Sequence, residues 1–228
     1  LEDGFWYKKG YAAFRDDIKV FLALAKKHDI KVKFVLFDYL AVTEGNFGMT
    51  KAETDTLVRD FVVPFLKEFG SSADSAIRTV ELMNEPEWIL NPNEVPGGVG
   101  SKIRNRAPVG KADYLYFVEQ LSRAIRQHGS KELKVTIGAS VHKHQVVTDP
   151  AVRPFVDYYA FHYYPYMGPL EGWLARLPND KPFALEEYPT GARPQYASLV
   201  QTPAQYTAIA ARYGALSAMA WQWHSIQW

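Results

Sequence analysis

Two carboxylate-bearing stretches, each placed after a short apolar run and before a proline, are the residues best suited to chemistry. Residues 80–83 lead into Asn84-Glu85-Pro86, and residues 183–185 lead into Glu186-Glu187-Tyr188-Pro189. Proline lacks a backbone N–H and forces the residue before it to be extended, so we expect the first strand to end at Glu85. Carboxylates at the ends of two strands could face each other across one cleft. Cleavage of a glycosidic bond needs such a pair, one protonated to donate and one ionised to attack or to activate water.

The second stretch offers two candidate carboxylates, Glu186 and Glu187. Neighbours on a strand point to opposite sides, so only one of the two is expected to reach the cleft. A purely structural interpretation also stays open at this point, in which each strand merely ends in polar residues.

Composition narrows the class of function without identifying it. The 228 residues are enough for a sizeable core, and we expect residues 1–228 to form a single domain. A formal net charge of +1 gives no reason to expect nucleic acid or a membrane as a partner. The lack of cysteine excludes disulfides and thiolate metal sites. Aromatic residues make up 14% of the chain, which suits stacking on sugar rings, although many cores hold as many.

The chain shows no apolar run long enough to span a bilayer, and residues 1–9 do not have the pattern of a signal peptide. A mature secreted enzyme would look the same once its signal had been removed. Localisation therefore stays unknown, with secretion suspected.

Helical and strand patterns alternate along the chain. Apolar periodicity and short buried runs predict helices over 11–28, 51–70, 114–129 and 203–213, and strands over 31–40, 77–83, 133–137, 155–162, 182–187 and 215–221. Capping boxes begin the second and fourth helices at Thr50 and Thr202. Pro64 should kink the second helix. A long loop is expected from Glu87 to Gly110, with Lys102, Arg104 and Arg106 as its solvated basic residues.

This alternation predicts parallel strands joined by right-handed crossovers. Polar and aromatic residues gather where the predicted strands end: Asp38, Tyr39, Asn84, Glu85, His142, His162, Tyr164, Glu187, Trp221 and Trp223. No glycine-rich phosphate loop follows a strand, which argues against a nucleotide-binding doubly wound sheet. Residues supplied by many strand ends to one face favour an α/β fold of the TIM (β/α)8-barrel type.

The motifs at these strand ends resemble those of clan A retaining glycoside hydrolases, most closely glycoside hydrolase family 5, the cellulase and mannanase superfamily. Asn84-Glu85-Pro86 is similar to the end of the family's strand 4. The resemblance implies that Glu85 is the acid/base and that Asn84 binds the sugar 2-hydroxyl.

Three further motifs follow in the family's order and extend the likeness over nearly the whole chain. His162-Tyr163-Tyr164 resembles the strand 6 His-x-Tyr, which implies that Tyr164 hydrogen-bonds the nucleophile. Glu187 matches the strand 7 nucleophile, and Trp221 matches the strand 8 tryptophan that floors the sugar site. His162 could instead be a buried histidine bonded to backbone, and Trp221 a core residue.

Two parts of the family pattern have no counterpart here. Counting from the matched motifs, the chain holds about six βα units, strands 3 to 8, so the barrel is expected to be incomplete. The strand 2 arginine that supports the nucleophile in the family is absent. Unpaired edges at strands 3 and 8 would be a liability, so we predict a covering loop or self-association at these edges.

The sequence thus predicts retaining hydrolysis of a β-linked glycan, of the β-1,4-glucan or β-mannan type, without a cofactor or metal. Glu187 would attack, and Glu85 would donate a proton. The charge on Glu187 is expected to raise the pKa of Glu85. The alternative is a carbohydrate-binding remnant that has lost catalysis. A third hypothesis is a metal site at His142-Lys143-His144, although imidazoles two residues apart after a strand are more often surface or cleft residues.

Overall fold

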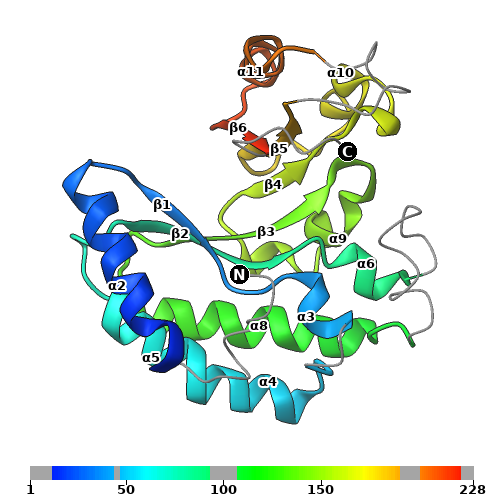
Figure 1. Cartoon of the computed structure of the whole chain (residues 1–228). Coiled ribbons are helices and arrows are strands. Elements are labelled where there is room, and N and C mark those ends of the chain that lie inside the picture. Colours follow the sequence, from blue (N-terminus) through cyan, green and yellow to red (C-terminus); the bar gives the residue numbers. More distant parts are fainter. Residues whose placement is uncertain (1–11, 44–46, 93–106, 191–200, 222–228) are drawn as a thin grey trace.

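The computed structural model describes residues 12–43, 47–92, 107–190 and 201–221. Its centre is one parallel sheet whose six strands are ordered β1 to β6 as in the sequence (Figure 1). The strands are β1 (Val32–Val35), β2 (Ile77–Asn84), β3 (Lys134–Ser140), β4 (Tyr159–His162), β5 (Phe183–Pro189) and β6 (Ala218–Trp221). Parallel neighbours in sequence order agree with the predicted βα alternation.

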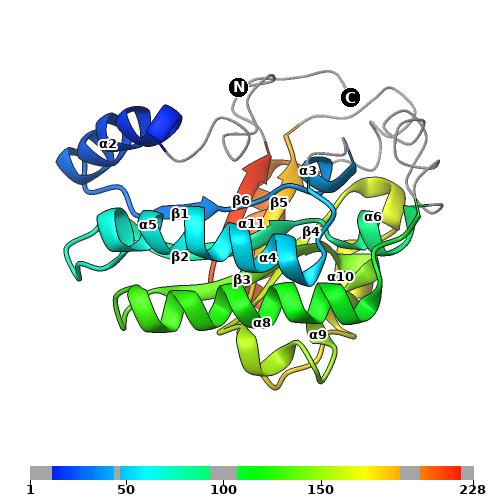
Figure 2. The same ribbon diagram turned by 90° about the horizontal axis from the view of Figure 1, so that it is seen from below.

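Helices lie between the strands along the chain and cover the outer face of the sheet. The longer ones are α2 (Ala12–Lys27), α8 (Lys111–His128), α11 (Pro203–Arg212) and a continuous helix made of α4 (Lys51–Leu57), η1 (Val58–Val62), α5 (Val63–Phe65) and η2 (Leu66–Gly70). Short ones are α3 (Tyr39–Thr43), α6 (Glu87–Leu90), η4 (Val141–Lys143), α9 (Gln145–Thr148), η5 (Arg153–Phe155), η6 (Pro165–Met167) and α10 (Leu170–Leu174). Figure 2 shows α4, α5 and α8 running along one face of β1 to β3.

The main hydrophobic core fills the layer between these helices and the sheet. Phe34 of β1 packs against Phe65, and Phe117 of α8 contacts Phe37 and Phe47. Phe65 and Phe117 are fully buried. Burial of aromatic side chains of this size is the largest favourable term that holds α8 and the α4–η2 helix against the sheet.

The sheet is strongly curled into a half-barrel. In a flat sheet, β1 and β5 would lie about 19 Å apart at ~4.8 Å per strand. Lys33 of β1 nevertheless forms an ion pair with Glu186 of β5. Their side chains can meet only if the strands bend around a shared concave interior, so the architecture is an incomplete α/β barrel, as the sequence predicted.

Three predicted strands are shorter than expected, among them the last, which begins at Ala218 rather than at residue 215. The strand predicted over 31–40 ends at Val35, and Tyr39 begins α3, because the Asp38 carboxylate accepts a hydrogen bond from the backbone N–H of Leu40 and turns the chain. The strand predicted from residue 155 begins only at Tyr159. Pro154 lies in the first turn of η5, where its fixed φ suits a helical turn better than a strand.

Local helix signals are confirmed where they were strongest. Thr50 and Thr202 each cap a helix through a complete capping box, with Glu53 and Gln205 as their partners. The helix continues through Pro64, which lies between the π-helical segments η1 and η2. Wider π turns accommodate the missing N–H of a proline without ending the helix.

The two sheet edges carry exposed apolar side chains. Val35 of β1 and Met219 and Trp221 of β6 are exposed, as are Phe21 and Leu24 of α2. Self-association at these edges stays a prediction. Among the described helices, none has the length and apolar character needed to cross a membrane.

The capping box at Thr50 gives a direct stability prediction. In Thr50→Ala, the N–H of Glu53 loses its side-chain acceptor, so we expect the free energy of unfolding to fall by about 1 kcal/mol in urea titrations. Thr56→Ala is the matched control because Thr56 is exposed within the same helix and does not cap it. Equal losses in the two variants would contradict the capping role.

Candidate active site

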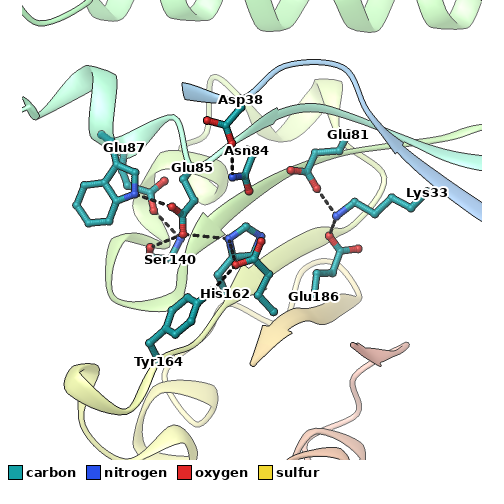
Figure 3. Close-up of polar contacts among 12 residues, drawn as sticks. Lys33, Asp38, Glu81, Asn84, Glu85, Glu87, Ser140, His162, Tyr164 and Glu186 are labelled. Carbon is teal, nitrogen blue, oxygen red and sulfur yellow. Dashed lines mark hydrogen bonds and ion pairs between the residues drawn. The ribbon is translucent and has the colours of Figure 1, made fainter. Parts of the chain in front are cut away.

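The carboxyl ends of the central strands bring the predicted site residues into one row. Asn84 pairs with Gly138, Ser140 with His162, and His162 with Glu187. Because parallel strands end at the same edge of the sheet, side chains far apart in the sequence converge there (Figure 3).

Glu85 stands just past the end of β2 and is held by three donors. Trp88 Nε1 donates to its Oε2 at 2.7 Å, Ser140 Oγ approaches Oε1 at 3.5 Å, and His162 Nδ1 lies 3.2 Å from the same oxygen. Its backbone φ of 48° is unusual for a residue with a side chain. Strain of this kind persists where the surroundings fix a conformation, as they do between Asn84 and Pro86.

Glu187 approaches the same histidine from β5. Tyr164 donates its hydroxyl to Glu187 Oε2 at 2.7 Å, and His162 Nδ1 lies 3.5 Å from that oxygen. One oxygen of Glu85, one oxygen of Glu187 and a ring nitrogen of His162 all lie within 4.8 Å of one another. The carboxylate side chains keep 15% and 13% exposure, whereas His162 keeps 2%. The pair is therefore accessible to a ligand, and the imidazole is not.

Alternation along β5 does not separate Glu186 from Glu187, which corrects the expectation that only one would face the interior. Leu185 pairs with Phe161 and Glu187 with the next residue, His162, so β5 contains one extra residue, Glu186. Such a bulge re-aims side chains. Glu186 reaches Lys33 and accepts a 2.7 Å hydrogen bond from Tyr158, while Glu187 reaches His162.

The pKa values of Glu85 and Glu187 also differ from the expectation that the charge on Glu187 raises the pKa of Glu85. Burial by itself would raise the pKa of Glu85, but the hydrogen bond and charge of His162, together with the N–H of Trp88, lower it below its ordinary value. Burial raises the pKa of Glu187 to about 7, against the opposing charge of His162. The sequence-based prediction of a raised pKa at Glu85 is thus wrong, because three donors converge on Glu85.

His162 carries positive charge in this site. Burial by itself would lower its pKa, but the charge of Glu187 and the hydrogen bond and charge of Glu85 outweigh burial and raise the pKa to about 10. His162 is therefore neither a backbone-bonded core histidine nor a neutral ring. It is a buried cation between two carboxylates.

Asn84 lies beside the pair, with its amide fixed by Asp38. Asn84 Nδ2 donates to Asp38 Oδ2 at 2.8 Å, and burial raises the pKa of Asp38. This contact identifies which end of the amide is the nitrogen and directs the amide of Asn84 in the site. The sequence shows Asp38 only as one of several polar residues at strand ends. Its pairing with Asn84 could not be predicted, because it depends on how β1 and β2 align.

Glu87 and Ser140 are contributors that sequence reasoning missed. The backbone N–H of Ser140 donates to Glu87 Oε1 at 2.7 Å, and among the described residues Glu87 Oε2 has no hydrogen-bond partner. Burial and the charge of Glu85 raise the pKa of Glu87 to about 8. Their proximity to Asn-Glu-Pro was the available signal, because one helical turn, α6, folds Glu87 and Trp88 back toward Glu85.

Two aromatic side chains near the carboxyl ends of the strands are exposed. Tyr166 is exposed and lies parallel to Tyr164, with ring centroids 6.1 Å apart. Trp221 ends β6 beside Pro189 and is 38% exposed, so it is not a core residue. The predicted strand-end residue Trp223 and the predicted basic loop residues Lys102, Arg104 and Arg106 lie outside the described residues.

The described residues offer one cluster with the geometry of a metal site, and it is Glu85, His162 and Glu187 rather than His142-Lys143-His144. The His142 ring lies near the rings of Trp88 and Trp173, and His144 Nδ1 lies 3.1 Å from the Val141 carbonyl oxygen. A metal at the cluster would have to displace the proton of His162, whose pKa is raised to about 10. A metal and the proton on the ligating nitrogen of His162 therefore exclude each other at this cluster.

The sequence matches no family model and no curated protein. Among solved structures, the chain is similar to a β-glucuronidase of Ruminococcus gnavus, with 12% identity and a TM-score of 0.39 over 78% of this chain and 29% of that one. A β-glucuronidase from Ruminococcus gnavus in complex with D-glucuronic acid gives 14% identity and a TM-score of 0.38, over 75% of this chain and 28% of that one. The chain thus spans less than a third of these structures, and a likeness this distant carries no argument about function.

Glu87 gives a pH-dependent stability prediction. Its pKa is raised to about 8 in the fold, above the ordinary value of 4.5, so the folded state holds the proton more tightly and loses stability as pH rises from about 4.5 towards 8. Glu87→Gln removes this loss and should be more stable than the parent at pH 8 by roughly 1–3 kcal/mol, with little difference at pH 4. Urea unfolding at several pH values measures it. Exposed Glu132→Gln is the control, and identical pH slopes in all three proteins would refute the assignment.

Proposed function

We propose that this protein is a retaining glycoside hydrolase that cleaves β-linked glycans of the β-1,4-glucan or β-mannan type, on part of a (β/α)8-type barrel. The observation that carries the proposal is the close approach of Glu85 and Glu187, with an oxygen of each and a nitrogen of His162 inside 4.8 Å. Retaining enzymes hold their carboxyl groups ~5–5.5 Å apart, whereas inverting enzymes leave ~6.5–9.5 Å for a water. The short spacing supports retention.

The reaction takes place in two displacements. Glu187 attacks the anomeric carbon while Glu85, protonated, gives its proton to the leaving glycosidic oxygen. Glu85 then takes a proton from water, which displaces Glu187 and restores the sugar with its original configuration. The Tyr164 hydroxyl, 2.7 Å from Glu187 Oε2, holds the attacking carboxylate in position.

His162 supplies a positive charge beside the nucleophile, the role that a strand 2 arginine has in the glycoside hydrolases that these motifs resemble. It lies 3.5 Å from Glu187 and 3.2 Å from Glu85, so one buried cation serves both carboxylates. A cation at this position stabilises the ionised nucleophile and the carboxylate that forms as Glu85 loses its proton.

Substrate recognition rests on Asn84 and the exposed rings around the pair. The amide of Asn84, fixed by Asp38, binds the sugar 2-hydroxyl. Tyr166 and Trp221 present exposed aromatic faces on which sugar rings can stack. The alternative is a sugar-binding remnant on the same six-stranded sheet, and it predicts binding without turnover.

The first test is reducing-sugar release by the 228-residue chain from a panel of β-glucans and β-mannans. We expect release that Glu187→Gln abolishes and that a chelator leaves unchanged, because no step uses a metal. Glu186→Gln is the matched control, since it alters the neighbouring carboxylate without touching His162. Sugar binding without release would favour the remnant, and loss of release in chelator would favour metal chemistry.

The second test assigns the two carboxylates to their roles, because their pKa order in the empty site is the reverse of the one the reaction uses. With an activated aryl β-glycoside and azide, Glu187→Ala should form the inverted α-glycosyl azide, since azide replaces the nucleophile. Glu85→Ala should form the retained β-glycosyl azide through the covalent intermediate, with turnover of unactivated glycan reduced ~10²–10⁴-fold. Exchanged products would exchange the roles.

A further inference from the structure

The two ring nitrogens of His162 face different carboxylates. Nδ1 faces Glu85 and Glu187, at 3.2 Å and 3.5 Å. Nε2 borders the space beside Gly138, where a Cβ atom would lie 2.6 Å from Nε2 and 2.7 Å from Glu81 Oε1. Only glycine leaves this space open, so a side chain at residue 138 would force the imidazole and Glu81 apart. In Figure 3, Glu81 and Glu85 lie on different sides of His162.

Glu81 is fixed in this position by an ion pair. Its side chain keeps 1% exposure and pairs with Lys33, which also pairs with Glu186. Burial and the charge of Glu186 raise the pKa of Glu81, and the charges of Lys33 and His162 only partly offset that rise. A buried carboxylate whose partner is a cation has little freedom to turn away from the imidazole.

We propose that His162 relays a proton between Glu187 and Glu85, and that Glu81 is the positioning residue that keeps the far nitrogen of the ring, Nε2, protonated. This inference rests on the proposed glycosidase function, because the relay places the proton where that reaction needs it. In this proposal, Glu81, Gly138 and Lys33 position His162 from the side of its ring that faces away from Glu85 and Glu187.

The relay step balances in atoms and charge. The Nδ1–H bond of His162 breaks as its proton forms an O–H bond with Glu85. The lone pair left on Nδ1 then accepts the proton of the Glu187 carboxyl. One proton has moved from Glu187 to Glu85, and the imidazolium is restored. Glu81 restricts proton exchange to one nitrogen of the ring. A carboxylate that faces Nε2 holds the Nε2 proton in place, so Nδ1 is the nitrogen that exchanges its proton.

The charged groups around His162 agree with this arrangement. Glu81, Glu85 and Glu187 all raise its pKa, and Asp38 interacts with it in the same sense. Lys33 lies beyond Glu81 as seen from His162, and it forms ion pairs with Glu81 and Glu186. Removal of Glu81 alone should therefore weaken the protonation of His162 without changing a group that touches the sugar.

The test compares Glu81→Gln with Glu186→Gln, since each removes one of the two carboxylates paired with Lys33 and only Glu81 faces His162. Nitrogen-15 NMR of the assigned His162 ring in the 228-residue chain reads its protonation directly. In Glu81→Gln we expect the titration midpoint to fall by at least about one pH unit, and in Glu186→Gln by much less. The alkaline limb of the kcat profile should shift with it, with KM nearly unchanged.

An unchanged His162 midpoint in folded Glu81→Gln would overturn the inference, as would a lowered midpoint with an unaltered kcat profile. If circular dichroism shows that this variant does not fold, Gly138→Ala takes its place, because the added methyl separates Glu81 from His162 without removing a charge; an unchanged midpoint there counts equally against the inference. Failure of the parent chain to release sugar from any glycan would instead refute the proposed function, while the NMR comparison would still decide the link between Glu81 and His162.

Discussion

Neutralisation of buried carboxylates by two cations is the interaction on which the concave interior depends. Curling the sheet brings Glu81, Glu186, Glu85 and Glu187 into one small space, where unpaired charge would be costly. Lys33 binds the first two, and His162 lies between the last two. The same contacts fix the shape, because Lys33 joins β1 to β2 and β5 and so ties the first strand to the far side of the sheet.

Small residues make room for this polar interior. Ala160 and Ala184 pair across β4 and β5 and are buried next to Tyr158, whose hydroxyl binds Glu186. Gly138 leaves the space through which Glu81 faces the imidazole. The large apolar side chains lie instead on the outer face, under the helices, so the stability of the sheet and the chemistry of its interior are carried by opposite faces of the same strands.

The number of hydrogen-bond donors around each of the two carboxyl groups decides which of them holds a proton more tightly. Three donors converge on Glu85 and lower its pKa, whereas Glu187 has fewer and its pKa is raised to about 7. Near neutral pH the pair therefore holds less than one full proton, mostly on Glu187, with a protonated imidazole in contact with both carboxylates. Groups coupled this closely titrate as a unit, so the site is better described by its shared protons than by either carboxyl alone.

The sequence by itself determined the alternation of helices and strands, the capping boxes at Thr50 and Thr202, and the residues that stand at strand ends. These depend on local periodicity and on proline, which act over a few residues. The tertiary structure alone decided that a bulge turns both Glu186 and Glu187 inward, that Lys33 pairs across the interior, and that the pKa of Glu85 is lowered rather than raised. Each of these depends on distances between strands far apart in the sequence, which are set by the curl of the sheet and leave no trace in local pattern.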